Sequence, residues 1–316
     1  MQKQGKKVLK ASVPAKKNTW ARDFQKNKSL YLMVLPVLAF YAIFCYKPLY
    51  GLVMAFQDFN PRLGFTGSEW VGSKHFQMFF TSSDFPRLLK NTLTISLSSL
   101  IVCFPFPIIL AIFLNEIRST GYKRVIQTVS YLPHFISMVV ICGMIKTFVA
   151  GDGIIGQFIA FFTGNKSNLL LQPHAFTPIY VISQIWQNIG WDSIIYLSAL
   201  TSIDTQLYEA AEVDGAGRFR KIWSITLPSL KETMVILFVI SVGGVMSLGY
   251  EKIMLLYSPA IYETSDVIST YVYRSAFGSQ NWSYSAAIGM FNSVVNLLLV
   301  VLANKVSQKL TGSSLW

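Results

Sequence analysis

The chain has 316 residues, of which 52% are hydrophobic and only 13% are charged, and its mean hydropathy is +0.44. A soluble domain of this size carries about 25% charged residues. The composition therefore excludes a soluble domain and indicates an integral membrane protein. The formal net charge of +12 does not indicate nucleic-acid binding, because no basic stripe alternates with aromatic stacking residues on a soluble face.

Six apolar runs have about the 20 residues that a bilayer span requires. They are roughly Leu30–Tyr50, Asn91–Leu114, Val125–Val149, Pro178–Ile203, Thr233–Gly249 and Ser285–Ala303. The first run is too long, and its basic leader too extended, for a cleaved signal peptide, so we expect it to be kept as an anchor. The predicted organisation is a basic tail over 1–28, a six-span domain over 29–304 and a short tail over 305–316.

The basic residues predict the orientation. With the N-terminus in the cytoplasm, the inner segments carry 18 Lys and Arg residues and the outer segments carry nine. This bias follows the positive-inside rule, so both termini and the segment 204–232 are expected in the cytoplasm of a multi-pass protein of the cell membrane. The net positive charge then serves topology and contact with anionic lipid.

The predicted fourth span carries a polar ridge. Residues recurring every four positions form it, and two more lie beside it: Tyr180, Gln184, Asn188, Asp192 and Tyr196, with Gln187 and Trp191. Polar groups in hydrocarbon are costly, so the ridge should face the bundle interior or a wet cavity. It can supply hydrogen bonds between helices, or it can be a substrate pathway, with amides and a carboxylate for sugar hydroxyls and aromatic faces for sugar C–H groups. Asp192 is the only acidic residue well within a predicted span.

A charged segment over 204–228 separates the fourth and fifth spans. Asp204 is a good N-cap for a helix beginning at Thr205, and Gly215 is a good terminator. A second amphipathic stretch contains Phe219, and Pro228 is expected to break the pattern before the next span. A helix–turn–helix with exposed charge and no catalytic group, held on a membrane protein, predicts a docking element for a soluble partner.

Other motifs give no catalytic, cofactor or metal site. Gly151, Gly153 and Gly156 spell G-x-G-x-x-G, but they lie in an outer loop rather than in a βαβ unit, so a glycine-rich turn is the better interpretation. The sequence lacks a phosphate-binding loop, and its three His and three Cys residues lack metal-ligand spacing. We therefore expect a non-enzymatic subunit without cofactor or metal, and any ATP must be bound and hydrolysed by a partner.

The charged segment resembles the EAA loop of binding-protein-dependent ABC importer permeases, in which EAA is followed by Gly and then by Ile-x-Leu-Pro. Every place is filled, by Glu209, Ala210, Ala211, Gly215, Ile225, Leu227 and Pro228. The stretches Tyr131–Ser137, Ile185–Trp191, Ser247–Ile253 and Asp266–Arg274 are similar to one branch, the carbohydrate-uptake permeases often labelled LplB or YtcP, which resemble the F-type subunit of the maltose importer.

This resemblance implies an all-α permease fold with six transmembrane helices and a cytoplasmic coupling loop that inserts into a groove of an ATPase. The implied coupling residues are Glu209, Ala210, Ala211, Asp214, Gly215, Phe219, Ile225, Leu227 and Pro228. The implied partners are an ABC ATPase dimer, a second homologous permease, an extracytoplasmic solute-binding protein and the lipid bilayer, and the implied substrate is an oligosaccharide.

Two alternatives remain open at the level of sequence. One is import of another solute, such as a peptide, a polyamine or phosphate. The other is a secondary transporter, which usually has several ionisable residues within the membrane and paired broken helices. A membrane enzyme would need a catalytic constellation, and the sequence offers none.

Overall fold

The structure is a computed structural model that describes residues 23–24, 26–164, 166–312 and 314–315. Most of the predicted basic tail over 1–28 lies outside the described residues. The chain divides into two units, Met1–Leu52 and Val53–Trp316, which are considered separately.

The first unit contains the predicted first span. It is formed by α2 (Lys28–Phe40), the π-helical η1 (Tyr41–Tyr46) and the beginning of the 3-10 helix η2 (Lys47–Phe56). Together these make a 29-residue segment, Lys28–Phe56, that is long and apolar enough to cross a membrane. This unit buries none of its most apolar window within itself, so it presents a large hydrophobic surface, as a segment that crosses a bilayer does.

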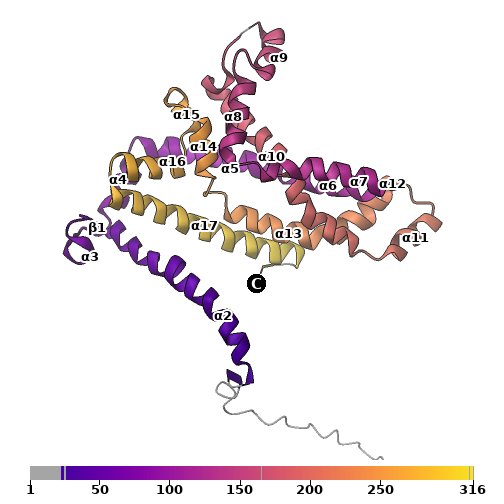
Figure 1. Ribbon diagram of the computed structural model, residues 1–316, viewed down its shortest axis with the longest axis horizontal. Helices are drawn as coiled ribbons and strands as arrows, with labels where there is room; N and C mark the ends of the chain where they lie inside the picture. The colour runs from indigo at the N-terminus through magenta and orange to yellow at the C-terminus, as the bar shows by residue number, and fades with distance from the viewer. Residues whose placement is uncertain (1–22, 25, 165, 313, 316) are drawn as a thin grey trace, which may run out of the picture. The chain divides into compact units, whose positions relative to one another are not determined.

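A small folded segment precedes the second span. The short strands β1 (Gln57–Asp58) and β2 (Glu69–Trp70) pair antiparallel around α3 (Gly64–Gly67), and α4 (Lys74–Thr81) follows. The second span itself consists of α5 (Asp84–Cys103) and α6 (Pro105–Glu116). They meet at Phe104, where Pro105 and Pro107 begin the new helix (Figure 1).

The third predicted span is not one straight helix. Its residues fall in α7 (Thr120–Tyr131), the 3-10 helix η3 (Leu132–Phe135) and α8 (Met138–Val149). The chain is extended at Ile136 and Ser137, and the Ser137 hydroxyl caps α8. The long apolar segment is instead Met138–Thr163, which runs through α8 and α9 (Ile154–Thr163). The prediction of a span over Val125–Val149 is therefore corrected.

The three glycines of the G-x-G-x-x-G pattern form the corner between α8 and α9. A Cβ at Gly153 would overlap the carbonyl oxygen of Thr147, and one at Gly156 would overlap that of Ala150. The glycines thus allow two backbones to approach closely. This agrees with a glycine-rich turn.

Helix α10 (Phe176–Thr201), 26 residues long, follows the 3-10 turns η4 (Leu169–Leu171) and η5 (Pro173–Ala175). It packs against α5, α6, α7 and α13 and is the centre of the second unit (Figure 1). It covers the predicted fourth span, but it is not among the five segments whose length and hydropathy suffice for crossing a membrane. Its polar ridge lowers its hydropathy, so composition alone supports five spans rather than six.

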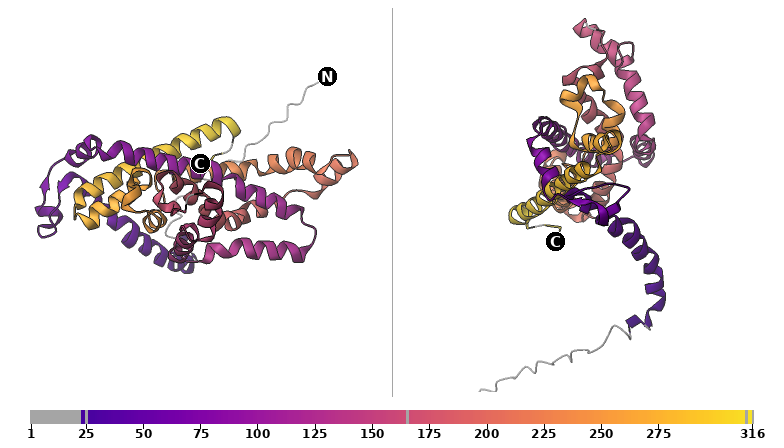
Figure 2. Two further views of the ribbon diagram at one scale, coloured as in Figure 1. Left: turned by 90° about the horizontal axis from the view of Figure 1, so that it is seen from above. Right: turned by 90° about the vertical axis from the view of Figure 1, so that its left-hand side faces the viewer.

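A hairpin then leads into the next long helix. The segments are α11 (Thr205–Val213), α12 (Arg218–Lys221), the π-helical η6 (Ile222–Thr226) and α13 (Leu227–Gly243). Figures 1 and 2 show α11 and α12 at one end of the second unit, away from α15 and α16. Helix α13 begins and ends about six residues before the predicted Thr233–Gly249.

The segment between the predicted fifth and sixth spans is helical. It contains α14 (Tyr250–Leu256), η7 (Pro259–Ile261), α15 (Tyr262–Ser265), α16 (Ile268–Tyr273) and η8 (Arg274–Gly278). Two apolar clusters join these elements to the long helices, one around α8, α10 and α14 and one around α4, α5, α16 and α17. A third cluster packs α6, α10 and α13 together. The last helix, α17 (Trp282–Thr311), continues into the predicted tail over 305–316.

Candidate functional site

The hairpin has the local structure that its sequence predicts. The Asp204 carboxylate accepts a hydrogen bond from the Gln206 backbone N–H at 2.9 Å and caps α11. Gly215 has φ +74°, in the left-handed region that glycine adopts without strain, and it turns the chain toward α12. The backbone N–H of Ala216 donates to the Ala211 carbonyl at 2.8 Å, which closes the end of the helix.

Two side-chain contacts hold α11 against the beginning of the next helix. The Tyr208 hydroxyl lies 3.0 Å from the buried Thr226 hydroxyl, and Lys221 Nζ donates to Glu212 Oε1 at 2.5 Å. The hydrogen bond from Lys221 lowers the pKa of the Glu212 carboxyl below its usual value, so this carboxylate stays charged at neutral pH. These contacts make the hairpin and the beginning of α13 one structural element.

Pro228 does not break the helix. It occupies the first turn of α13, and the backbone is helical from Arg218 to Gly243. A proline lacks an N–H group and its ring crowds the carbonyl four residues earlier. The turn before it is widened into a π-helix over Ile222–Thr226, which is a common way to accommodate such a defect. The expected break at Pro228 is therefore wrong.

The hairpin presents bulky apolar side chains to solvent. Val213 and Phe219 are each 89% exposed and Trp223 is 76% exposed. Of the predicted coupling residues, six are exposed and three are half-buried: Glu209, Ala210, Asp214, Gly215, Phe219 and Pro228 in the first group, and Ala211, Ile225 and Leu227 in the second. Sequence reasoning did not include Val213 among them, although its place beside the turn residue Asp214 was a usable signal.

The polar ridge of α10 does not form one continuous surface. Tyr180 and Gln187 are buried and Gln184 is half-buried, and these three surround a lysine from α14. Lys252 Nζ donates to Gln184 Oε1 at 3.1 Å and to Gln187 Oε1 at 3.4 Å, and it lies 5.3 Å from the centre of the Tyr180 ring. This end of the ridge is satisfied inside the protein.

The middle of the ridge faces the turn between α7 and α8. Asn188 Oδ1 lies 3.0 Å from His134 Nδ1, and the His134 ring stacks on Trp191 with centroids 4.5 Å apart. Beside them a Cβ at Gly190 would overlap the Ser130 carbonyl oxygen, so the glycine lets α10 and α7 touch. These contacts join α10 to the turn between α7 and α8, which is the kind of contact that the interpretation of the ridge as hydrogen bonds between helices describes.

Only three ridge residues share a cavity. Gln184, Asp192 and Tyr196 line a hollow of about 330 Å³ together with residues of α5, α6, α13 and the turn after α13, among them Ser96, Ser99, Ser241 and Leu248. In the part of the chain that the structure describes, the Asp192 carboxylate makes no hydrogen bond or ion pair, and its side chain is exposed. A carboxylate, an amide and a phenol can bind sugar hydroxyls, so this hollow is the candidate interior site.

Sequence reasoning assigned Lys252 only to an outer segment and gave it no role. In the structure it is 2% exposed and lies on a helix packed against α8. The signal was the apolar stretch Ile253–Leu256 that follows it, which is unusual for a solvated loop.

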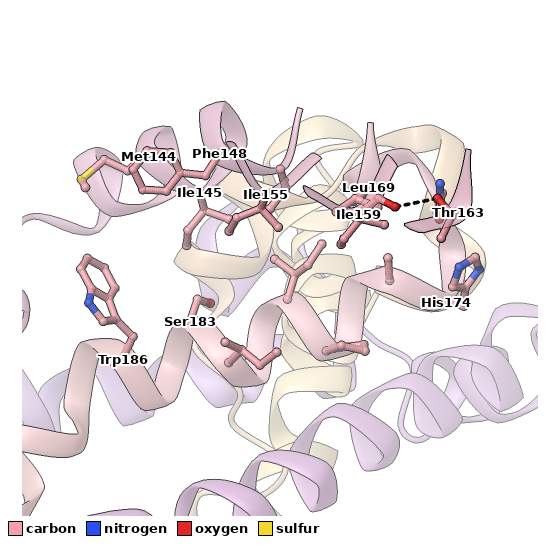
Figure 3. A pocket seen from close by; sticks show the side chains of 16 residues that line it. Met144, Ile145, Phe148, Ile155, Ile159, Thr163, Leu169, His174, Ser183 and Trp186 are labelled. Atoms are coloured by element: carbon pink, nitrogen blue, oxygen red, sulfur yellow. Dashed lines mark hydrogen bonds between the residues drawn. The ribbon is translucent and has the colours of Figure 1, made fainter. Parts of the chain in front are cut away.

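A second, larger cavity lies on another face of α10. It measures about 860 Å³ and is walled by α8, α9 and α10 (Figure 3). Its lining is mainly aliphatic and aromatic, including Phe148, Ile155, Ile182 and Trp186. Such a wall suits an apolar helix or a lipid chain and offers few partners for hydroxyl groups, so we do not assign it to a sugar.

The α14–α16 segment is organised by a buried carboxylate. Asp266 is fully buried, and its two oxygens accept hydrogen bonds from the Arg274 guanidinium at 2.8 and 2.7 Å. Thr270 also donates to Asp266 at 2.8 Å, and the guanidinium lies 4.4 Å from the centre of the Tyr262 ring. The hydrogen bonds from Asp266 raise the pKa of Arg274 further, so it remains a cation.

A bundle of apolar helices around a small polar cavity, with one charged hairpin at its end, defines a membrane transport subunit. Residues 103–312 match the family described as "Binding-protein-dependent transport system inner membrane component", and the chain belongs to that family.

Relatives match over nearly the whole chain. The "Polygalacturonan/rhamnogalacturonan transport system permease protein YteP" of Bacillus subtilis (strain 168) is 45% identical, covering 90% of this chain and 89% of its own. "Protein LplB" of the same organism is 40% identical, covering 94% of each chain.

Two solved structures share the fold. The crystal structure of a bacterial ABC transporter involved in the import of the acidic polysaccharide alginate contains a chain with a TM-score of 0.85 and 43% identity, covering 93% of this chain and 100% of that one. The crystal structure of a bacterial alginate ABC transporter in complex with an alginate pentasaccharide-bound periplasmic protein also contains a similar chain. That chain has a TM-score of 0.85 and 42% identity, and the match covers 94% of this chain and 99% of that one. The predicted all-α ABC importer permease fold is confirmed.

Proposed function

We propose that this chain is the transmembrane permease subunit of an ABC importer that moves an oligosaccharide, delivered by an extracytoplasmic solute-binding protein, across the cell membrane. The observation that carries the proposal is the likeness of 93% of the chain, at 43% identity, to a chain of an alginate importer. The names of its relatives, which include transport systems for polygalacturonan and rhamnogalacturonan, support a sugar as the substrate.

The hairpin 204–228 is proposed to dock on a partner ATPase in the cytoplasm. Its exposed Val213, Phe219 and Trp223 support this, because large apolar side chains that protrude from a charged surface are typical of interaction sites. An ATPase dimer offers two equivalent grooves, and this chain supplies one hairpin. A second, related permease therefore completes the assembly, and the partner ATPase binds and hydrolyses the ATP.

The cavity lined by Gln184, Asp192 and Tyr196 is proposed to form part of the pathway. Asp192 is exposed in the isolated subunit although it lies in the middle of α10, which corresponds to the predicted fourth span. A charged residue at such a position is expected to face a wet surface or a partner. The interface with the second permease supplies such a surface, and alternating access would expose it first outward and then inward.

The coupling role is tested in the assembled complex, reconstituted in vesicles with its binding protein, by measuring sugar uptake together with ATPase activity. Glu209→Lys and Gly215→Pro should abolish both the uptake and the stimulation of the ATPase by the loaded binding protein, while the protein still inserts. Proline cannot adopt the φ of +74° that Gly215 has, so Gly215→Pro disrupts the turn.

Two matched variants control for charge reversal and for proline itself. Glu232→Lys changes an exposed glutamate on α13, and Gly217→Pro places proline at φ −68°, a value that its ring favours. Both should transport normally. Full coupling in Glu209→Lys and Gly215→Pro would contradict docking through this hairpin.

The assembly itself is tested by mild-detergent purification from the native host, with mass spectrometry of the chains that are retained. An ATPase, a second permease and a solute-binding protein are expected. Recovery of a homo-oligomer without an ATPase, even after cross-linking at Glu209, would refute the assignment.

A further inference from the structure

Lys252 is a buried cation whose described partners are all neutral. Its side chain is 2% exposed, and its ammonium group contacts the amide oxygens of Gln184 and Gln187 and the ring face of Tyr180. Within the described ranges, no carboxylate forms an ion pair with it. Two half-buried cations differ from it: Arg274 pairs with the buried Asp266, and Lys221 pairs with Glu212.

An ammonium group removed from water without a counter-ion is costly, and amide oxygens and a ring face offset only part of that cost. An apolar side chain of similar size would fill the same space with less penalty. An anion that reaches this position would therefore be bound strongly, because a charge-assisted hydrogen bond is roughly twice as strong as a neutral one.

The ammonium group adjoins the interior cavity. Gln184 both accepts its hydrogen bond and lines the hollow, and Leu248, four residues before Lys252 in the non-helical segment that leads into α14, lines it too. The hollow of about 330 Å³ lies within the range of small-molecule sites, about 300–1,000 Å³. Lys252 itself is not part of the cavity lining, so the role proposed below requires its flexible stem to move Nζ past Gln184 to the cavity wall.

The two ends of this wall differ in charge. Asp192 lies eight residues after Gln184 on α10, which is about 12 Å along the helix axis. A carboxylate that enters the cavity is therefore attracted at the Lys252 end and repelled at the Asp192 end, where only hydroxyl groups are favoured. This arrangement gives a bound sugar a preferred orientation.

We propose that Lys252 is an anion-binding residue of the translocation pathway and that the substrate is an oligosaccharide containing uronate residues, whose carboxylates pair with its ammonium group during passage. This inference rests on the proposed function and narrows its substrate to an anionic class.

The first test is uptake by the complete complex, with its ATPase, second permease and binding protein, reconstituted in vesicles. The probes are oligomers of galacturonate, glucuronate and alginate and their carboxyl-reduced, neutral counterparts. Lys252→Met should lower uptake of the acidic oligomer about tenfold or more, the loss expected for one charged hydrogen bond. Lys252→Arg, which keeps the charge, should retain most of the uptake, and so should Lys146→Met, an exposed lysine on α8.

The second test does not depend on how well a variant folds. A carbodiimide joins a substrate carboxylate to a lysine amine as an amide, with the water taken up by the reagent. Applied to the wild-type complex arrested with vanadate and loaded with the acidic oligomer, it should attach the sugar to Lys252, which mass spectrometry of the peptide would detect. The carboxyl-reduced oligomer should give no adduct.

The outcomes separate the two proposals. Uptake of acidic oligomers that persists within twofold in Lys252→Met, or the lack of an adduct at Lys252 in an active complex, would overturn the role of this residue. Import of neutral oligomers alone would overturn the anionic substrate and leave the oligosaccharide importer intact. An assembled complex that imports none of the probes, acidic or neutral, would overturn the proposed function itself.

Discussion

Replacing Arg274 by methionine tests the buried carboxylate that organises α14–α16. In Arg274→Met, Asp266 loses two hydrogen bonds of 2.8 and 2.7 Å. It keeps the Thr270 hydroxyl, and Arg87 Nη2 lies 3.6 Å away. A hydrogen bond to a charged group contributes about 1.5–3 kcal/mol, and breaking a buried ion pair by removing one partner costs about 3–5 kcal/mol. We therefore expect a loss of about 3–5 kcal/mol.

The measurement is the midpoint of thermal unfolding of the detergent-purified protein, followed by tryptophan fluorescence. For a unit of this size, 1 kcal/mol corresponds to about 2–4 °C, so the expected fall is about 6–20 °C. Arg62→Met, at an exposed arginine, is the matched control and should change the midpoint by less than about 2 °C.

A double variant separates an unpaired charge from lost packing. In Arg274→Met with Asp266→Leu, the carboxylate is removed as well, and an apolar pair of similar volume is often as stable as a buried ion pair. Most of the lost stability should return. A fall of less than 2 °C in the single variant, or a double variant that is no more stable than it, would refute the reasoning.

Three further predictions concern close packing and the hairpin. Gly190→Val should lower stability by about 1–3 kcal/mol in the same assay because its side chain meets the α7 backbone, whereas Gly289→Val, where a Cβ has open space, should be tolerated. Because Lys221 lowers the pKa of Glu212, the stabilisation from their contact is complete above pH 4.5 and is lost as the pH falls through the lower folded-state pKa. The protection of the hairpin amides from hydrogen exchange, taken relative to the intrinsic exchange rate at each pH, should therefore fall below pH 4.5 in the wild type. Glu212→Gln should show the lower protection at neutral pH already, and equal protection of the two proteins at neutral pH would contradict this. Phe219→Ser should leave the unfolding midpoint unchanged, since the ring is 89% exposed, but should reduce the ATPase that co-purifies with the protein.

Local chemistry made the hairpin readable from the sequence. An Asp cap and a glycine with positive φ act through neighbouring backbone groups, so Asp204 and Gly215 marked the limits of α11 correctly. The effect of Pro228 was misjudged because a π-helical turn over the five residues Ile222–Thr226 accommodates it, and such a turn has no recognisable residue pattern in the sequence. The limits of the spans were also displaced where two helices follow each other across a short turn, as at the four residues between α8 and α9.

Tertiary contacts decided the rest of the site. A four-residue spacing indicated that Tyr180, Asn188 and Asp192 share one side of α10, but the helix they face changes along its length. The partner of Tyr180 is Lys252, 72 positions later in the sequence, and the partner of Asn188 is His134, 54 positions earlier. Pairings over such separations leave no periodic signal, so packing and pathway could not be distinguished from spacing alone.

The junction between α10 and α11 has a mechanical consequence. Ser202, Ile203 and Asp204 connect α10, which lines the cavity, to α11. The contact of Tyr208 with Thr226 joins α11 to the residues just before α13, which also lines the cavity. The two helices α10 and α13 are therefore both connected to the hairpin. We expect a displacement of the hairpin to move α10 and α13 together and to change the width of the cavity between them.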